Sequence, residues 1–148
     1  MRKSKEIIVD YPVPNDPDGG VVTVRHIPPG EVADIDAVVN HVEMRLVEGE
    51  GKLLREGEIH LPKGDDRYLY AVKAVTGWKN FFEEDGKTER PCTPANIVDV
   101  CRSESVLIDV EDGTKKLVPF GEFIGMCREK LVALDRARRE KIEKNSSR

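Results

Sequence analysis

Three cysteines are the first residues of this sequence that could do chemistry, as metal ligands or as a redox pair. Cys92, Cys101 and Cys127 are separated by eight and then twenty-five residues. Structural zinc sites use closely spaced cysteine pairs and redox motifs use Cys-x-x-Cys, and neither spacing occurs here. The three histidines also stand alone in the sequence: His26, His41 and His60. We therefore expect free structural thiols, no metal and no cofactor, with a metal site assembled by folding as the alternative.

A run of carboxylates is the second group that could do chemistry. The run Glu-Glu-Asp-Gly-Lys-Thr-Glu, from Glu83 to Glu89, lacks the alternating ligand positions of a calcium-binding loop and is better explained as a charged turn. The sequence also contains no phosphate-binding loop, dinucleotide-binding, zinc-protease or serine-hydrolase motif. We therefore predict a protein that is not an enzyme, and we assign no catalytic residue.

Charge is distributed unevenly along the chain. Of its 148 residues 35% are charged and 39% are hydrophobic, and the formal net charge is −4. Residues 128–148 hold eight basic and four acidic residues, which leaves sixteen basic and twenty-four acidic residues in the rest of the chain. A basic tail can contact nucleic acid. Here acidic residues lie one helical turn from basic ones, as Asp135 does from Arg139, and this favours a solvated helix stabilised by charge pairs.

Hydropathy gives no sign of a membrane span or a secretion signal. No run approaches the roughly 18 apolar residues that a transmembrane helix needs. The charged start, Met-Arg-Lys-Ser-Lys-Glu, is followed by only three apolar residues rather than by the core of a signal peptide. We expect a soluble protein with no membrane partner, and the cytoplasm is its default location.

Two short β-branched runs near the start predict an antiparallel hairpin over residues 5–27. KEIIVD and GVVTVRHI are separated by YPVPNDPDGG, in which prolines and Asp-Gly-Gly favour a turn. A helix over about residues 31–48 should follow, because apolar residues there recur at steps of three and four and so form one stripe. The stripe residues are Val32, Ile35, Val39, Val42 and Leu46.

Capping residues predict three further helices. Asp65 or Asp66 is the expected N-cap of a helix over about 65–76, and Thr93 before Pro94 begins one over about 93–103. The last helix, over about 120–134, has an apolar stripe made of Phe123, Ile124, Cys127, Leu131 and Leu134. After that stripe there is little left to bury, so we expect residues 135–148 to be a charged, basic C-terminal extension.

Residues 105–120 allow two interpretations. Asp112-Gly113 lies between the apolar runs 106–110 and 117–120, which is typical of a hairpin, although the same turn could link two helices. We favour the hairpin. The predicted fold is then α+β, with an N-terminal hairpin followed by a small helical domain of about four helices. Residues 1–134 are expected to form a single globular domain.

The stretch TGWKNFFEEDGKTERPCTPANI, residues 76–97, gathers the only tryptophan and two of the four phenylalanines. Trp78 follows the predicted helix end and is expected to pack inward. Phe81 and Phe82 are adjacent, so on an extended segment they point to opposite sides and at most one is well buried. Trp78, Phe81 and Phe82 are our candidate partner-binding residues, the exposed phenylalanine above all; an ordinary exposed aromatic is the alternative.

The order of motifs in this region resembles the tail assembly chaperones of long-tailed bacteriophages and prophages. In that family a valine-rich helix leads into a Gly-Trp pair, an Asp-Gly turn and a Pro-Cys-Thr-Pro-x-Asn-like helix start, as in VKAVTGWKN, EEDGKTE and PCTPANIVDV here. The resemblance touches most of the chain, but residues 75–98 carry its specificity. The expected hairpin at 105–120 departs from the family, which should be helical or variable there.

The resemblance implies a non-catalytic binding protein of the host bacterial cytoplasm that is absent from the mature virion. Its partner would be the long, apolar tape measure protein, kept soluble until tail tube subunits polymerise around it. The tail tube protein and a small homo-oligomer are further partners to consider. Two other functions stay open. One is a structural tail or head-tail component that forms oligomers, and the other is a nucleic-acid-associated accessory protein that uses the basic C-terminal helix.

We predict that replacing Cys92, Cys101 and Cys127 together by serine or alanine lowers the free energy of unfolding by about 1 to 3 kcal/mol, because small apolar side chains are lost without loss of a site. Chemical denaturation measures the change, and partner binding should persist. Stoichiometric zinc in protein purified without a chelator would contradict this prediction.

Overall fold

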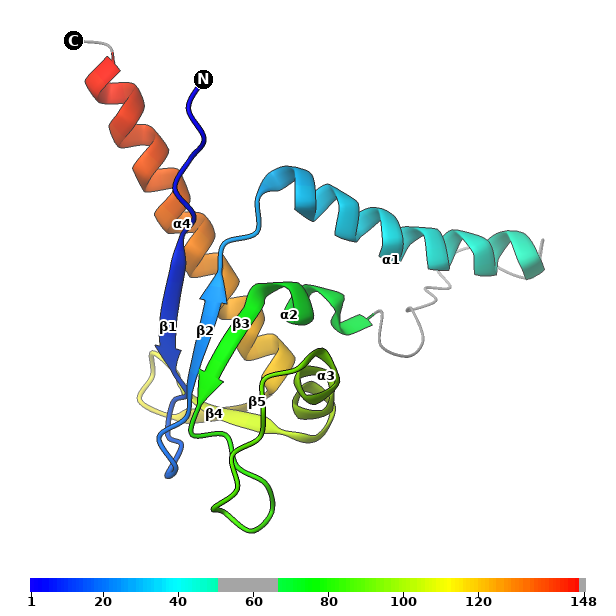
Figure 1. Cartoon of the computed structure of the whole chain (residues 1–148), viewed down its shortest axis with the longest axis vertical. Helices are drawn as coiled ribbons and strands as arrows, with labels where there is room; N and C mark the ends of the chain where they lie inside the picture. The colour runs from blue at the N-terminus through cyan, green and yellow to red at the C-terminus, as the bar shows by residue number, and fades with distance from the viewer. Residues whose placement is uncertain (51–66, 147–148) are drawn as a thin grey trace. The chain divides into compact units, whose positions relative to one another are not determined.

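The computed structural model of the chain describes residues 1–50 and 67–146, with side chains for residues 1–39 and 67–145. The chain divides into two compact units, unit 1 made of Met1–His26 and Ala71–Arg148, and unit 2 made of Ile27–Tyr70. The described residues form four helices and five strands (Figure 1). The fold is α+β and begins with a hairpin, as the sequence predicts.

A three-stranded antiparallel sheet in the order β1-β2-β3 forms one side of unit 1. The predicted N-terminal hairpin is confirmed as β1 (Ile8–Pro12) and β2 (Val21–Arg25). The third strand, β3 (Val75–Lys79), was not predicted, since the sequence favoured a helix up to residue 76. Helix α2 (Leu69–Ala74) ends earlier because Val75, Thr76 and Gly77 are poor helix formers that can pair with β2 instead.

The second predicted hairpin is also confirmed, as β4 (Ser105–Asp109) and β5 (Lys115–Pro119). Gly113 adopts φ 87° in its turn, a conformation that glycine allows at little cost, and Val110 N–H donates to Thr114 O at 2.9 Å. Val106 lies opposite Val118, and both are buried. Because side chains alternate along a strand, the next pair, Leu107 and Leu117, lies on the other face of the hairpin.

Helix α3 (Pro94–Ser103) begins as predicted. The side chain of Thr93 accepts a hydrogen bond from Asn96 N–H at 3.2 Å, and Pro94 stands in the first turn, where a missing N–H does no harm. The buried face of α3 consists of Ile97, Val98, Val100 and Cys101.

Helix α4 (Phe120–Ser146) crosses behind the three-stranded sheet and packs against β2, β4, β5 and α3 (Figure 1). Most of its predicted apolar stripe is buried, but the assignment of Leu134 to that stripe is wrong, since this residue is 48% exposed. Asp135 is buried instead. Residue 135 follows Leu131 by four positions and therefore lies on the same face of the helix, whereas residue 134 is turned away from the core.

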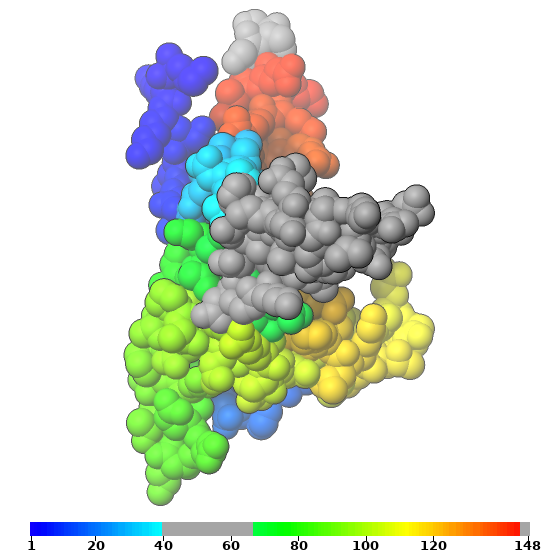
Figure 2. Space-filling view, turned by 90° about the vertical axis from the view of Figure 1, so that its right-hand side faces the viewer, coloured from blue at the N-terminus to red at the C-terminus, as the bar shows by residue number. Residues whose placement is uncertain are grey.

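Charged contacts anchor the part of α4 that the sequence assigned to a C-terminal extension. Asp135 accepts hydrogen bonds from Arg138 Nη2 and Arg139 Nε, both at 2.9 Å, and lies 3.5 Å from His26 Nε2. Arg138 Nη1 also donates to the carbonyl oxygen of Lys5 at 2.7 Å. Figure 2 shows these turns of α4 (orange to red) close to the N-terminal segment (blue). The boundary at residue 134 thus falls inside a continuous helix whose next turn still contacts the body of unit 1.

Unit 2 contains α1 (Pro29–Glu50), which the sequence predicts over about 31–48. Ile35 is buried, and the Tyr70 hydroxyl donates a hydrogen bond to the Asp36 carboxylate. The side chains of Val42 and Leu46 and the predicted cap at Asp65 or Asp66 lie outside the described residues. Over residues 1–50 and 67–146, no helix combines the length and apolar character needed to cross a bilayer.

We predict that Asp135→Asn destabilises the protein by about 1 to 2 kcal/mol at pH 7, because three cationic or polar neighbours lose a charged acceptor. The hydrogen bond from Arg139, followed by the positive charges nearby, lowers the pKa of the Asp135 carboxyl. Its contribution is therefore full above the unfolded pKa of about 4 and is lost as the pH falls through the lower folded value.

Urea denaturation between pH 3 and 8 measures the difference between this variant and the wild type. The difference in the free energy of unfolding between the two proteins should disappear only below about pH 4. Glu140→Gln, an exposed position on the same helix, is the matched control and should leave the stability at pH 7 within about 0.5 kcal/mol. An equal effect of both substitutions would contradict the role given to Asp135.

Candidate functional site

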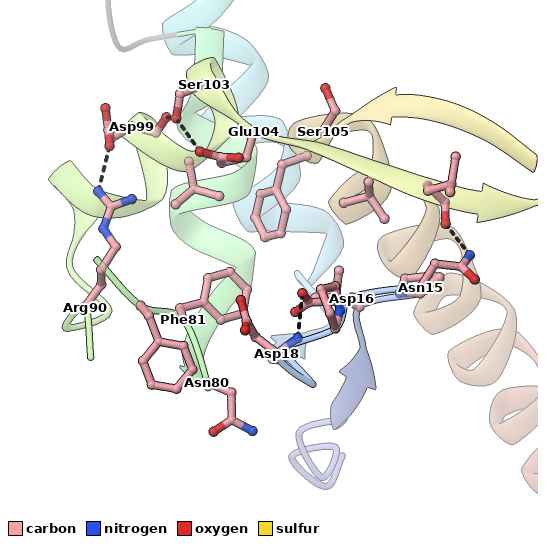
Figure 3. Close-up of a pocket in the computed structure, with 18 of the residues that line it drawn as sticks. Asn15, Asp16, Asp18, Asn80, Phe81, Arg90, Asp99, Ser103, Glu104 and Ser105 are labelled. Atoms are coloured by element: carbon pink, nitrogen blue, oxygen red, sulfur yellow. Dashed lines mark hydrogen bonds and ion pairs between the residues drawn. The ribbon is translucent and has the colours of Figure 1, made fainter. Parts of the chain in front are cut away.

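A groove with a volume of about 730 Å³ lies in unit 1 (Figure 3). Three segments that are distant in sequence form its walls: residues 13–18 between β1 and β2, residues 80–84 after β3, and residues 103–107 at the end of α3 and in β4. Leu117 of β5 and Phe120 of α4 also line it. We refer to this feature as the groove.

Aromatic rings form the floor of the groove. The ring of Phe81 stacks in parallel on that of Trp78, with centroids 4.4 Å apart, and meets Phe120 edge-on at 5.8 Å. Phe120 is only 2% exposed and continues the contact to Phe123, at 6.0 Å. The Trp78 indole N–H donates to the Arg90 carbonyl oxygen at 2.7 Å, so its polar atom is satisfied. The floor is thus continuous with the core.

The three sequence-predicted residues meet in this region in different roles. Phe81 and Phe82 both line the groove, whereas Trp78 supports Phe81 through the parallel stack. Both phenylalanines are half-buried, in keeping with the expectation that at most one is well buried, but neither is the exposed ring that the binding prediction favoured. Both residues follow the end of β3 at Lys79, so the alternation of a regular strand does not set the directions of their side chains. Phe81 turns toward the aromatic floor, and Phe82 belongs to the bridge with Glu89 that opens the next turn.

The side chains of two asparagines hold the β1–β2 loop against neighbouring segments through hydrogen bonds. Asn15 donates from Nδ2 to Leu107 O at 2.6 Å and accepts at Oδ1 from Lys115 Nζ at 2.9 Å. Asn80 donates from Nδ2 to Gly19 O at 3.0 Å. The two residues have φ of 57° and 60°, a left-handed conformation that asparagine tolerates better than most residues. The loop is therefore tied to hairpin β4–β5 on one side and to the end of β3 on the other.

Negative charge dominates the rim. The described lining residues include one cationic side chain, Arg90, and six carboxylates: Asp16, Asp18, Glu83, Glu84, Asp99 and Glu104. Arg90 Nη2 lies 2.6 Å from Asp99 Oδ2, and its Nε lies 3.8 Å from Glu83. Figure 3 shows Arg90 directed toward Asp99, away from Asp16 and Asp18. One guanidinium cannot balance six carboxylates, so the groove attracts cations.

The cysteines lie apart from the groove lining. Cys101 and Cys127 are buried, and burial raises the pKa of each thiol to about 11. Burial also raises the pKa of the half-buried Cys92. Thiols of this kind stay protonated at neutral pH and are poor nucleophiles. Within the described part of the chain, no cluster of three or more histidine, cysteine or carboxylate side chains could hold a metal ion.

Two parts of the groove were not predicted from the sequence: Leu117, which is 65% exposed, and the carboxylates Asp18 and Glu104. A signal for Leu117 was present, because alternation in a hairpin with Val118 inward places Leu117 outward. The carboxylates gave no comparable signal, since they lie 86 residues apart and only the fold brings them to one rim.

Comparison of the chain with protein-family models, with curated proteins and with solved structures gives no match.

We predict that Gly20→Ala destabilises the protein by about 1 to 2 kcal/mol, because the added Cβ would crowd a packed wall of the groove. That atom would lie 2.6 Å from Asp16 Oδ2 and 3.2 Å from Phe81 Cε1. Gly77→Ala in β3 is the matched control, since its added Cβ meets nothing within 4 Å. Thermal unfolding compares the two variants. Equal melting temperatures would contradict the prediction, because they would show that the groove wall accommodates the added methyl group without loss of stability.

Proposed function

We propose that this chain is a non-catalytic protein-binding module and that its groove holds a segment of a client protein. One observation carries the proposal: an apolar floor under a strongly acidic rim. The volume of about 730 Å³ lies within the usual range of about 300 to 1,000 Å³ for binding pockets. Leu117 is 65% exposed at the edge of the groove, and an apolar residue in such a place is available to a partner.

The chemistry of the groove defines the client segment it would accept. Apolar side chains would lie on Phe81, Phe82 and Leu117, which supply contact area. Lysine or arginine side chains on the same segment would face Asp18, Glu84 and Glu104 and set its direction. The best client is therefore a segment in which apolar and basic residues are mixed, and acidic segments are repelled.

We further propose that the client is the tape measure protein of a long-tailed bacteriophage or prophage, and that the chain is its tail assembly chaperone. The resemblance is specific in residues 75–98, and this stretch supplies β3, the stacked rings of Trp78 and Phe81 and the start of α3. The chaperone would act in the host cytoplasm, with the tail tube protein as a second partner, and would be absent from the virion. The β4–β5 hairpin remains the departure from the family pattern.

A nucleic-acid-associated role is favoured less. It would need the basic residues of α4, but Arg138 and Arg139 are engaged with Asp135, and Arg138 also with the Lys5 carbonyl. The acidic groove would repel phosphates. A structural tail component that forms oligomers is the other alternative, and it differs from the chaperone in remaining in the particle.

Co-expression with the tape measure protein encoded beside this chain tests the proposal. We expect the wild-type chain to keep that protein soluble and to co-purify with it. Phe82→Asp and Leu117→Asp should each weaken the complex at least about tenfold, because an interface residue is replaced by a charge. Val132→Asp is the matched control, since Val132 is also exposed and apolar but lies on α4 outside the groove.

Three outcomes would contradict the proposal. The tape measure protein could be equally soluble alone, or the control variant could weaken the complex as much as the groove variants. Finding the chain as a stoichiometric component of purified virions would support the structural alternative instead. DNA binding that persists at physiological salt and is lost on charge reversal in α4 would support the nucleic-acid alternative.

A further inference from the structure

Strand β4 presents a free edge to the groove. Hairpin β4–β5 is a sheet of two strands, so each strand has one edge that pairs with no other described strand. Ser105, Val106 and Leu107 of β4 line the groove. Figure 3 shows Ser105 across the groove from Phe81 and Asp18. A free strand edge is a template for pairing with a further strand.

The hydrogen bonds of the hairpin show which backbone groups point to that edge. Phe120 N–H donates to Glu104 O at 3.0 Å, and Val110 N–H donates to Thr114 O at 2.9 Å. In an antiparallel pair, residues that exchange hydrogen bonds alternate with residues whose N–H and C=O point away from the partner strand. The even-numbered residues of β4 therefore bond to β5, whereas the N–H and C=O groups of its odd-numbered residues point outward: residues 105, 107 and 109.

The contacts of these outward groups place the free edge at the groove. Leu107 O accepts a hydrogen bond from Asn15 Nδ2 at 2.6 Å, and Asn15 belongs to the β1–β2 loop, which also lines the groove. The amide of Asn15 thus takes the position that a backbone N–H of a neighbouring strand would take. Among the described residues, the N–H and C=O of Ser105 and the N–H of Leu107 have no such partner. Ser105 is exposed, so these three backbone groups are available to a ligand at the groove wall.

We propose that the client segment binds in an extended conformation and adds a strand to the free edge of β4. The segment would pair with both backbone groups of Ser105 and with the N–H of Leu107, and Asn15 would mark the end of the pairing. This inference rests on the proposed function, because it concerns the segment that the groove would hold. A strand can form these directional hydrogen bonds, whereas the backbone groups of a helix are already bonded within the helix.

The surroundings of this edge define the sequence of the added strand. Successive side chains of a strand point to opposite faces, so one set would lie on the aromatic floor and the other would point away from it. Apolar residues suit the first set, because Phe81 and Phe120 form the floor. Basic residues suit the second set, because the described rim holds six carboxylates and one guanidinium. The fitting client segment therefore alternates apolar and basic residues.

Backbone N-methylation of a peptide tests the inference on the wild-type protein. The probe is a peptide of alternating valine and lysine with blocked ends. In a strand the N–H groups of alternate residues point to the same side, so the valine N–H groups face one edge and the lysine N–H groups face the other. We expect methylation of one set to weaken binding at least about tenfold and methylation of the other set to change it less than about threefold, because only one set pairs with β4.

Isothermal titration calorimetry of the three peptides measures these affinities. A peptide bound as a helix would lose affinity on methylation of either set, because a helix uses the N–H groups of both. A peptide held by its side chains alone would keep its affinity after either change. Equal effects of the two methylated sets, or failure of the unmodified peptide to bind, would overturn the inference.

Proline substitution tests the same edge from the side of the protein. Ser105→Pro removes an outward N–H and no β4–β5 hydrogen bond, and proline is tolerated on a free strand edge. It should weaken binding of the unmodified peptide at least about tenfold. Asp109→Pro is the matched control, since residue 109 has the same outward orientation but lies outside the groove lining. Equal affinities of the two folded variants would contradict the inference.

Amide exchange resolved by NMR separates this inference from the proposed function. In the complex with the client, the amides of Ser105 and Leu107 should exchange at least about tenfold more slowly than in the free chain, because they gain acceptors. Client capture that Phe82→Asp abolishes, with the exchange of both amides unchanged, would overturn only the present inference. Pairing of the peptide with β4, without capture of the tape measure protein, would overturn only the choice of client.

Discussion

The packing of Phe120 is the contact on which unit 1 depends. This residue stands where β5 becomes α4, meets Phe81 after β3 and Phe123 in α4, and donates its backbone N–H to Glu104 O at 3.0 Å. The segment after β3 and the end of α3 thus both contact Phe120, which is 2% exposed. The same ring lines the floor of the groove. The candidate binding surface is therefore an open edge of the core, and its rigidity comes from core packing.

The two parts of the groove have separate physical roles. The floor belongs to the folded core, whereas the carboxylates of the rim lie on the β1–β2 loop, the turn after β3 and the end of α3. Loops held by a rigid scaffold are a common location for binding residues, because their side chains can change without loss of the fold. The hydrogen bonds of Asn15 and Asn80 hold that loop against its neighbours. In the binding mode that we propose, the floor would supply contact area and the rim would select the charge of the partner.

Local sequence signals predicted most of the helices and strands. The features that were missed depend on contacts between segments that are distant in the sequence. Thr93 with Pro94 gave the start of α3, and Asp112-Gly113 gave the β4–β5 turn, because caps and turns are decided by a few adjacent residues. Strand β3 was missed because its partner, β2, lies about fifty residues earlier in the chain. The pairing of Asp135 with Arg139 was predicted, but the burial of Asp135 beside His26 was missed because His26 lies 109 residues away in the sequence. Only Phe81 and Phe82 of the groove lining were predicted, since its walls meet through folding alone.

Hydrogen–deuterium exchange of the chain, alone and in complex with the client protein that we propose, tests the groove most directly. If the groove is the docking surface, amides of residues 81–84 and 103–107 should exchange at least about tenfold more slowly in the complex, because a bound segment suppresses local opening. Residues 8–12 of β1, outside the groove lining, should be unchanged. Protection that spares residues 81–84 and 103–107, in a complex that is otherwise intact, would place the client elsewhere and contradict the account.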